Sequence, residues 1–108
     1  MSISVNLYYH GKHGSARRFA EEMERSGLAD EIRAEEGNLS YRYFQPLDDP
    51  ETILLVDVWR DQAAIDAHHA SPMMRRLAAL REVYDLRVTA ERYASVDAPA
   101  SDERFLRK

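Results

Sequence analysis

The order in which strand-like and helix-like patterns follow one another constrains this chain most. Ile3–His10 alternates apolar and polar residues, which is the two-residue period of a half-buried strand. Residues 15–27 instead place apolar side chains three and four positions apart, as an amphipathic helix does. Ser15 is expected to cap that helix, because a serine oxygen can accept from the free amides of the first turn. A shorter helical stretch is expected over 28–34.

The second half of the chain repeats this alternation of patterns. Gly37 belongs to a turn, where it can take a positive φ. Asp61 is expected to cap a helix, and Ser71-Pro72 is expected to start the next one, with serine as the cap. The run over 52–59 is apolar on both sides, which is typical of a strand covered on both faces. The expected elements are strands over 39–45, 52–59 and 86–93 and helices over 62–69 and from Pro72 onward.

Strand, helix, strand, strand, helix, strand is the order of the split βαβ, or ferredoxin-like, arrangement. We therefore predict an α+β fold with a four-stranded antiparallel sheet and helices on one face. The other face would carry Tyr, Phe and Leu side chains, which is a large apolar patch for a monomer. We expect a two-fold homodimer in which two sheets face each other as a dimeric α/β barrel.

The length of 108 residues suits one domain. We predict a domain over residues 1–94 and a C-terminal tail over 95–108, where Phe105 and Leu106 are expected to pack on the partner subunit.

Composition excludes several function classes. The chain has no cysteine, which removes disulfides, thiolate nucleophiles and thiolate metal sites. Its net charge of −4 argues against nucleic acid, and no Gly-x-Gly-x-x-Gly or Gly-Lys-Ser/Thr supports a nucleotide site. No apolar run approaches the roughly 20 residues of a membrane span. We therefore expect a cytoplasmic protein with no membrane or nucleic-acid partner.

Three stretches carry a family resemblance through their order and spacing. They are Gly14-Ser15-Ala16-Arg17-Arg18-Phe19, Glu36-Gly37-Asn38-Leu39-Ser40-Tyr41, and Trp59 to Pro72 with His68 nine residues after Trp59. Together they resemble the antibiotic biosynthesis monooxygenase family of dimeric ferredoxin-like proteins, over about residues 3 to 93.

The resemblance implies a dimer whose pocket lies between sheet and helices. In characterised relatives, oxygen is inserted into electron-rich aromatic or quinol substrates without metal or flavin, and we expect a small hydrophobic substrate of this kind, dioxygen and no cofactor here. The family also holds haem-degrading enzymes and an isomerase of a small signalling sugar derivative. In the haem-degrading branch a Trp stands where this chain has His68 and a His stands near Ala78, so the resemblance argues against haem degradation.

His68 and Asn6 are the predicted catalytic residues. The resemblance makes His68 pocket-facing, where it would act as a base or as a hydrogen-bond donor to a phenolic oxygen. Packing against Trp59 is the structural alternative. Asn6 lies among apolar neighbours, where it would either stabilise an oxyanion or only bond backbone.

The predicted substrate-binding residues are aromatic or methionine side chains: Trp59, Tyr41, Phe44, Met73 and Met74. Each has a structural alternative, in the core or at the dimer contact. We predict no metal site, because His68 and His69 point about 100° apart on a helix. Glu35 and Glu36 are interpreted as exposed turn residues without a catalytic role.

These observations favour a cofactor-independent monooxygenase. Two alternatives remain: a non-catalytic dimeric protein that binds an apolar small molecule, and an acid–base isomerase that consumes no oxygen.

Overall fold

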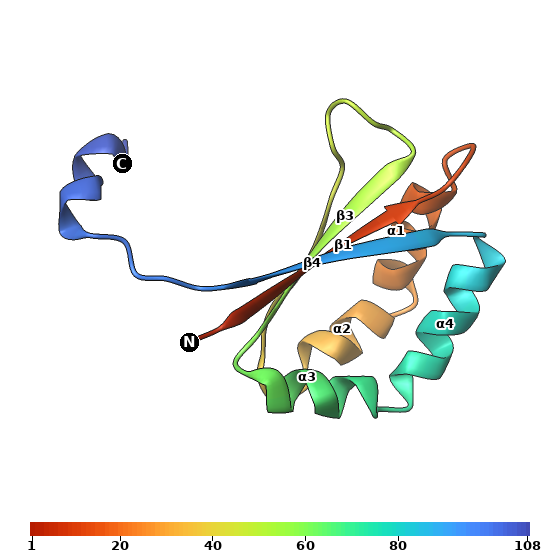
Figure 1. Ribbon diagram of the computed structural model, residues 1–108. Coiled ribbons are helices and arrows are strands. Elements are labelled where there is room, and N and C mark those ends of the chain that lie inside the picture. Colours follow the sequence, from red (N-terminus) through yellow and green to blue (C-terminus); the bar gives the residue numbers. More distant parts are fainter.

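The computed structural model describes residues 1–108 as a four-stranded antiparallel sheet with helices on one side only (Figure 1). The strand order is β2-β3-β1-β4, which confirms the split βαβ arrangement. The elements are β1 (Ile3–His10), α1 (Ser15–Arg25), α2 (Leu28–Arg33), β2 (Asn38–Phe44), β3 (Thr52–Trp59), α3 (Gln62–His69), α4 (Met73–Val83), β4 (Arg87–Ala94) and the 3-10 helix η1 (Ala100–Phe105). None of these helices has the length and apolar character that crossing a membrane requires.

Strand pairing determines which side chains meet the helices. Leu7 of β1 lies opposite Leu55 of β3 and Ala90 of β4, and alternate residues along each strand project to opposite faces. On the helix-covered face, Tyr9 packs against Phe19 of α1 with ring centroids 4.8 Å apart. Neither of these two rings is exposed to solvent. The other fully buried large side chains are Trp59, Tyr41, Met23, Leu28, Ile32 and Leu55.

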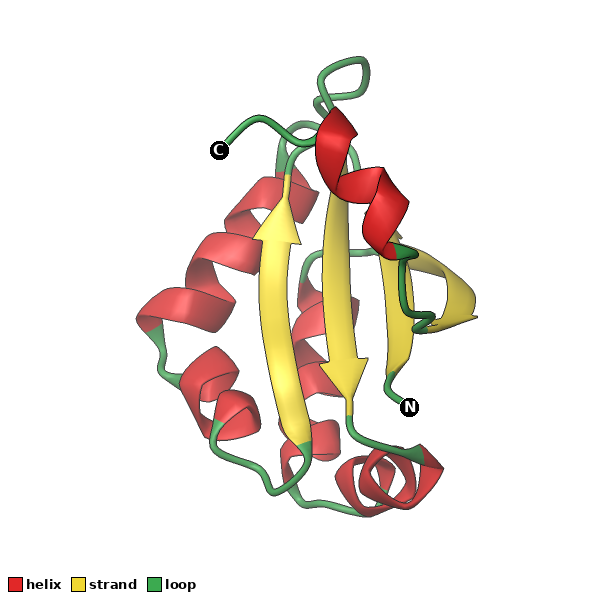
Figure 2. Ribbon diagram, turned by 90° about the vertical axis from the view of Figure 1, so that its left-hand side faces the viewer, coloured by secondary structure: helices red, strands yellow, loops and turns green.

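None of the helices α1 to α4 covers the opposite face of the sheet, and η1, which Figure 2 draws in front of this face, buries no residue. We call this face the open face. Its centre is the row Leu54, Val56 and Val58 of β3, which alternates with the buried residues of the same strand. Two exposed aromatic side chains flank this row, Phe44 of β2 and Tyr93 of β4. The open face is therefore apolar at its centre, as the sequence predicts.

The tail leaves the sheet at Ala94 and runs away from the domain (Figure 1). Its 3-10 helix buries no residue. Phe105 is 74% exposed and Leu106 is 60% exposed, so neither packs on its own domain.

Three local predictions need correction. Gly14, in a left-handed conformation, precedes α1, and the Ser15 hydroxyl accepts from the Lys12 amide instead of capping the helix. The carboxylate of Glu51, far away in sequence, organises this loop by accepting from the amides of residues 13 and 14. Ser71 does not cap α4 either, since Pro72 precedes the helix and the Ser71 hydroxyl has no partner.

The third correction concerns Leu39, because strict alternation along the strand predicted over 39–45 places it on the same side as Tyr41. A register irregularity between Asn38 and Ser40 breaks the alternation, and Leu39 is 60% exposed. The predicted positive φ of Gly37 and the Asp61 cap of α3 are both confirmed.

Candidate functional site

A cavity of about 310 Å³ lies between the helix-covered face of the sheet and the helices α3 and α4. Its walls are mostly apolar, and a few polar and charged groups project into it. The lining residues are Val5, Leu7, Tyr9, Tyr41, Leu55, Asp57, Trp59, Gln62, Ile65, His68, His69, Met74, Leu77, Arg81, Val88, Ala90 and Arg92. An apolar cavity with a few convergent polar groups is the usual form of a small-molecule site.

His68 reaches this cavity from the buried face of α3. The Asp61 carboxylate accepts from the Ala64 amide at 2.9 Å and so determines where the helix begins. Residues 64, 65 and 68 then share one buried face, as a helical period requires. The His68 ring lies against the Trp59 indole, with centroids 4.8 Å apart and planes inclined by 30°. The His68 side chain therefore both lines the cavity and packs against Trp59.

Glu35 binds the inner nitrogen of His68. The distance between His68 Nδ1 and Glu35 Oε1 is 2.6 Å, and the two side chains are only 6% and 14% exposed. A carboxylate on Nδ1 selects the tautomer and the orientation of the ring, which leaves Nε2 for proton transfer. Nε2 has no protein hydrogen-bond partner. The interpretation of Glu35 as an exposed turn residue is wrong, because α3 packs over the turn that carries it.

Gly37 lets this turn approach α3. It has φ +86°, and a Cβ added there would lie 2.5 Å from the Ala64 Cβ. The turn is held from the other side by the Arg60 amide, which donates to the Gly37 carbonyl at 2.8 Å. A glycine at this position is therefore what brings Glu35 within reach of His68.

Gly37→Ala is expected to destabilise the protein more than Gly27→Ala does. Gly27 has φ +85°, nearly the same value, but nothing lies within 4 Å of its added Cβ. In both variants an alanine must adopt a left-handed backbone conformation, which lowers the free energy of unfolding by about 1–2 kcal/mol. Only Gly37→Ala also overpacks its surroundings, which lowers it by roughly 1–3 kcal/mol more. Urea unfolding measures the two free energies. Equal losses would show that the turn can move away from α3 at no cost.

Asp57 is a second buried carboxyl group in the cavity, and it is 4% exposed. Its pKa is raised to about 7, chiefly by burial and also by the nearby Glu35 charge, and hydrogen bonding from the Trp59 indole and the Asn38 amide limits this rise. The Asn38 amide donates to Asp57 Oδ1 at 3.4 Å. Asp57 was missed as a site residue, although a carboxylate within the most apolar strand and on the Trp59 side was a usable signal.

The raised pKa of Asp57 makes stability depend on pH. The folded protein keeps the Asp57 proton up to about pH 7, whereas the unfolded chain releases it near pH 3.8. The folded state therefore binds more protons in this window, and the contribution of Asp57 to stability falls as pH rises from about 4 to 7. The loss amounts to as much as roughly 4 kcal/mol.

We expect Asp57→Asn to remove this slope, because the amide does not titrate. The measurement is the free energy of urea unfolding at several pH values between 4.5 and 8. Asp48→Asn, at an exposed loop position, is the matched control that should keep the slope of the parent protein. A slope that Asp57→Asn leaves unchanged would assign the pH dependence to another group.

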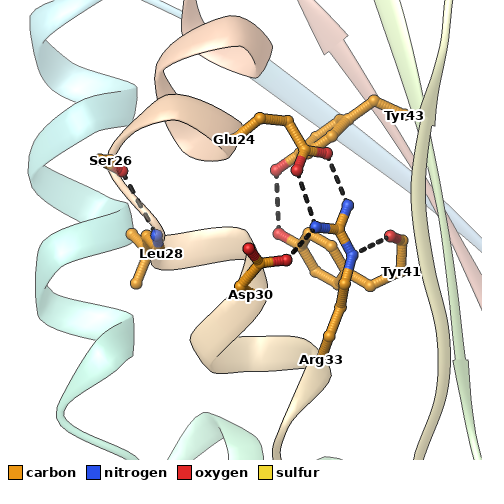
Figure 3. Close-up of polar contacts among 7 residues, drawn as sticks. All are labelled: Glu24, Ser26, Leu28, Asp30, Arg33, Tyr41 and Tyr43. Carbon is orange, nitrogen blue, oxygen red and sulfur yellow. Dashed lines mark hydrogen bonds and ion pairs between the residues drawn. The ribbon is translucent and has the colours of Figure 1, made fainter.

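Tyr41 forms part of the cavity wall, and Arg33 of α2 holds it there (Figure 3). Arg33 Nε donates to the Tyr41 carbonyl at 2.9 Å, and its other nitrogens pair with Glu24 and Asp30. The Tyr41 hydroxyl lies 3.0 Å from that of Tyr43. Burial raises the pKa of Tyr41 far above its usual range, so its hydroxyl stays neutral.

The structure brings together only some of the predicted site residues. His68, Trp59, Tyr41 and Met74 line the cavity, whereas Met73 packs at the edge of the core. Asn6 and Phe44 lie on the open face, so the prediction that they share a site with His68 needs correction.

The physical reason is the alternation along each strand. Asn6 stands between Val5 and Leu7, both of which face the cavity, so its own side chain points to the other side of the sheet. There its amide oxygen accepts from the Ser4 hydroxyl at 3.0 Å. Phe44 lies under the Arg42 guanidinium, 5.2 Å from the ring centroid.

Comparisons with known proteins identify the family. Residues 2–80 match the sequence profile of the family described as "Antibiotic biosynthesis monooxygenase". The chain is 35% identical over 67 residues to the Bacillus subtilis (strain 168) protein named "Putative monooxygenase YcnE", which is 62% of this chain and 68% of that protein.

Two solved structures show the same fold. SnoaB, described as a cofactor-independent oxygenase from Streptomyces nogalater, superposes with a TM-score of 0.75 at 14% identity, over 92% of this chain and 97% of its own. Rv0793 from Mycobacterium tuberculosis superposes with a TM-score of 0.74 at 20% identity, over 93% and 100%. With the sequence match over residues 2–80, the chain belongs to the antibiotic biosynthesis monooxygenase family.

Proposed function

We propose that this protein is a cofactor-independent monooxygenase that oxidises a small, electron-rich aromatic or quinol substrate with dioxygen. The observation that carries the proposal is the buried Glu35–His68 pair at the wall of an apolar cavity. Family membership and the cofactor-independent oxygenase that shares the fold support it.

The proposed reaction begins with proton transfer. His68 Nε2 takes the proton of a quinol hydroxyl, and the Glu35 carboxylate stabilises the imidazolium that forms. The resulting anion gives one electron to dioxygen, and the two radicals combine to form a peroxide at a ring carbon. The O–O bond then breaks as the ring carbon loses its hydrogen. One oxygen atom stays on the ring and the other leaves as water, so a hydroquinone and dioxygen give a hydroxyquinone and water, with every electron supplied by the substrate.

Asp57 is the proposed group that stabilises negative oxygen in this reaction, a role that the sequence assigned to Asn6. It lines the same cavity as His68, whereas the sheet separates Asn6 from His68. In its protonated form a carboxyl group can donate a hydrogen bond to the oxyanion or to the peroxide.

The experiment mixes the metal-free protein with a menadiol-like quinol and measures oxygen uptake above the autoxidation rate in buffer. A monooxygenase transfers one atom of ¹⁸O₂ to the organic product. Uptake that equals the buffer rate contradicts the proposal. Uptake that ends as hydrogen peroxide, without ¹⁸O in the product, would identify an oxidase instead.

An acid–base isomerase is the second candidate, and a specific observation favours it. Besides the His68 imidazole, the cavity holds a second group suited to acid–base chemistry, the Asp57 carboxyl group, whose pKa is raised to about 7. Such an enzyme turns over under nitrogen, which a monooxygenase does not. A protein that binds the ring compound and catalyses nothing under either gas would be a binding module.

We further propose that the working unit is a homodimer built through the open face. The apolar row Leu54, Val56 and Val58 and the exposed rings of Phe44 and Tyr93 support this. The exposed Phe105 and Leu106 are proposed to pack on the partner subunit, which would give residues 95–108 a place in the assembly.

A further inference from the structure

Arg81 of α4 lines the cavity with a guanidinium that the protein does not neutralise. No carboxylate lies within 4.0 Å of it, since it takes part in none of the ion pairs of the structure. Nη2 donates to the Tyr9 hydroxyl at 3.1 Å, and the guanidinium lies 5.4 Å from the centroid of the Tyr9 ring. Nη1 has no hydrogen-bond partner, and Nε is buried without one. Leaving a buried donor unpaired is unfavourable, so this arrangement calls for a ligand.

Arg33 shows what a structural arginine looks like in the same protein. Its side chain is 31% exposed, and all three of its nitrogens donate to Glu24, Asp30 or the Tyr41 carbonyl. Arg81 has the Tyr9 hydroxyl as its only partner, although it is also partly buried. The difference indicates that Arg81 is positioned for something other than holding the fold together.

Charged side chains of the cavity lie at two levels along β1. Val5 is paired with Asp57, Leu7 with Leu55, and Tyr9 with Ile53. The Val5 level carries Asp57 and also Arg92 of β4, whose guanidinium donates to Gln62. The Leu7 level is apolar, and Tyr9, at the third level, binds Arg81 through its hydroxyl. The outer two levels are four residues apart on β1, about 13 Å at the rise of a strand. This length suits a fused aromatic ring system with a substituent at each end.

We infer that Arg81 binds an anionic carboxylate carried by the substrate, so that the substrate is an aromatic acid rather than a neutral ring compound. The planar guanidinium offers paired N–H groups that match the two oxygens of a carboxylate. With the carboxylate held on Arg81, the ring hydroxyl is left free to reach His68, which lines the same cavity. The inference rests on the proposed function and names the substrate class of that same site.

The test compares the binding of 6-hydroxy-2-naphthoate and of its neutral amide, 6-hydroxy-2-naphthamide, by fluorescence titration. Neither probe has to react, so oxygen chemistry does not enter the measurement. We expect the naphthoate to bind roughly 10- to 100-fold more tightly, as a charge-assisted hydrogen bond in a partly buried site should give. Arg81→Gln should abolish this preference and leave the amide's Kd unchanged.

Three further variants separate binding from structure. Arg75→Gln, on the exposed side of the same helix and outside the cavity, should keep the full preference. Tyr9→Phe removes the hydroxyl to which Arg81 donates, and this variant should also keep the preference for the naphthoate. Arg81→Lys keeps the charge without the planar fork and should retain part of the preference, which gives a usable result if Arg81→Gln does not fold.

The outcomes distinguish this inference from the function on which it rests. Equal affinity of the native protein for acid and amide would overturn the inference while the cavity still binds ring compounds. A preference that survives in Arg81→Gln would also overturn it, and would point to Arg92, the other arginine of the cavity. Failure of both probes to bind would instead count against the proposed function.

Discussion

His68→Ala is expected to lower kcat for oxygen-dependent quinol turnover by roughly 100- to 10,000-fold, the range that a positioned general base contributes. The alanine cannot accept the hydroxyl proton, and the other imidazole of the cavity, His69, has its ring centroid 5.8 Å from that of His68. The measurement is oxygen uptake with an autoxidation blank. His13→Ala, in the exposed loop before α1, is the control that should keep the native rate.

Glu35→Gln tests whether the two residues act as a pair. The amide can still bond the ring, but it carries no charge to stabilise an imidazolium, so we expect a smaller loss, on the order of 10- to 100-fold. The double variant should then lose little more than His68→Ala alone, because residues that act as a unit are not additive. If the loss of kcat in the double variant equals the product of the two single-variant losses, Glu35 and His68 do not act as a pair.

Added imidazole separates a chemical role of His68 from a structural one. It should restore part of the rate of His68→Ala by occupying the space that the ring leaves, whereas it cannot repair a misfolded protein. A native kcat in His68→Ala would refute the proposed mechanism outright.

Val56→Glu is expected to break the proposed homodimer. Val56 stands at the centre of the open face, where it pairs with Asn6 on one side and Arg42 on the other. Burying a carboxylate at the contact costs several kcal/mol in desolvation even with Arg42 beside it, so we expect the dimer Kd to rise roughly 100-fold. Light scattering over a dilution series measures the molecular mass and the Kd.

The matched control places the same charge on the other side of the molecule. Val83 of α4 is 73% exposed, so Val83→Glu should leave the dimer intact. A native protein that is monomeric at every concentration would refute the dimer. Identical behaviour of the two variants would show that the open face is not the contact.

Deleting residues 100–108 tests the tail separately. Burial of Phe105 or Leu106 on a partner contributes about 1.5–3 kcal/mol for each side chain, so the deletion should raise the dimer Kd tenfold or more. An unchanged Kd and Tm would show that the tail has no part in the assembly.

Much of the fold could be predicted because its signals are local. Alternation in Ile3–His10 and the three-and-four spacing of α1 depend only on which face of an element is buried. Asp61 could be recognised as a cap because its acceptor lies only three residues from the amide it binds. The Ser15 prediction failed because the loop before α1 depends on Glu51, which lies in the turn before β3 and whose approach to this loop no local pattern reveals.

The site was harder to predict because it is built from separate elements. His68 and Trp59 could be identified from their spacing, and the structure shows their rings in contact. Glu35 was dismissed because a glutamate beside a glycine turn is ordinarily exposed, and its partner is 33 residues away. Asn6 was assigned to the wrong face because a polar residue in a strand does not by itself say which side of the sheet holds the cavity.

The sequence alone determined the element order and the residue types available for chemistry, because these follow from local periodicity and from the amino acids present, and its motifs carried the family resemblance. Only the tertiary structure decided which of those residues meet. The strand register set Asp57 and Val5 at one level and sent Asn6 to the open face. The close approach of Gly37 to α3 placed the Glu35 carboxylate on His68. Contacts of this kind depend on how elements distant in sequence pack, and a one-residue shift in a strand reverses the face of every side chain on it.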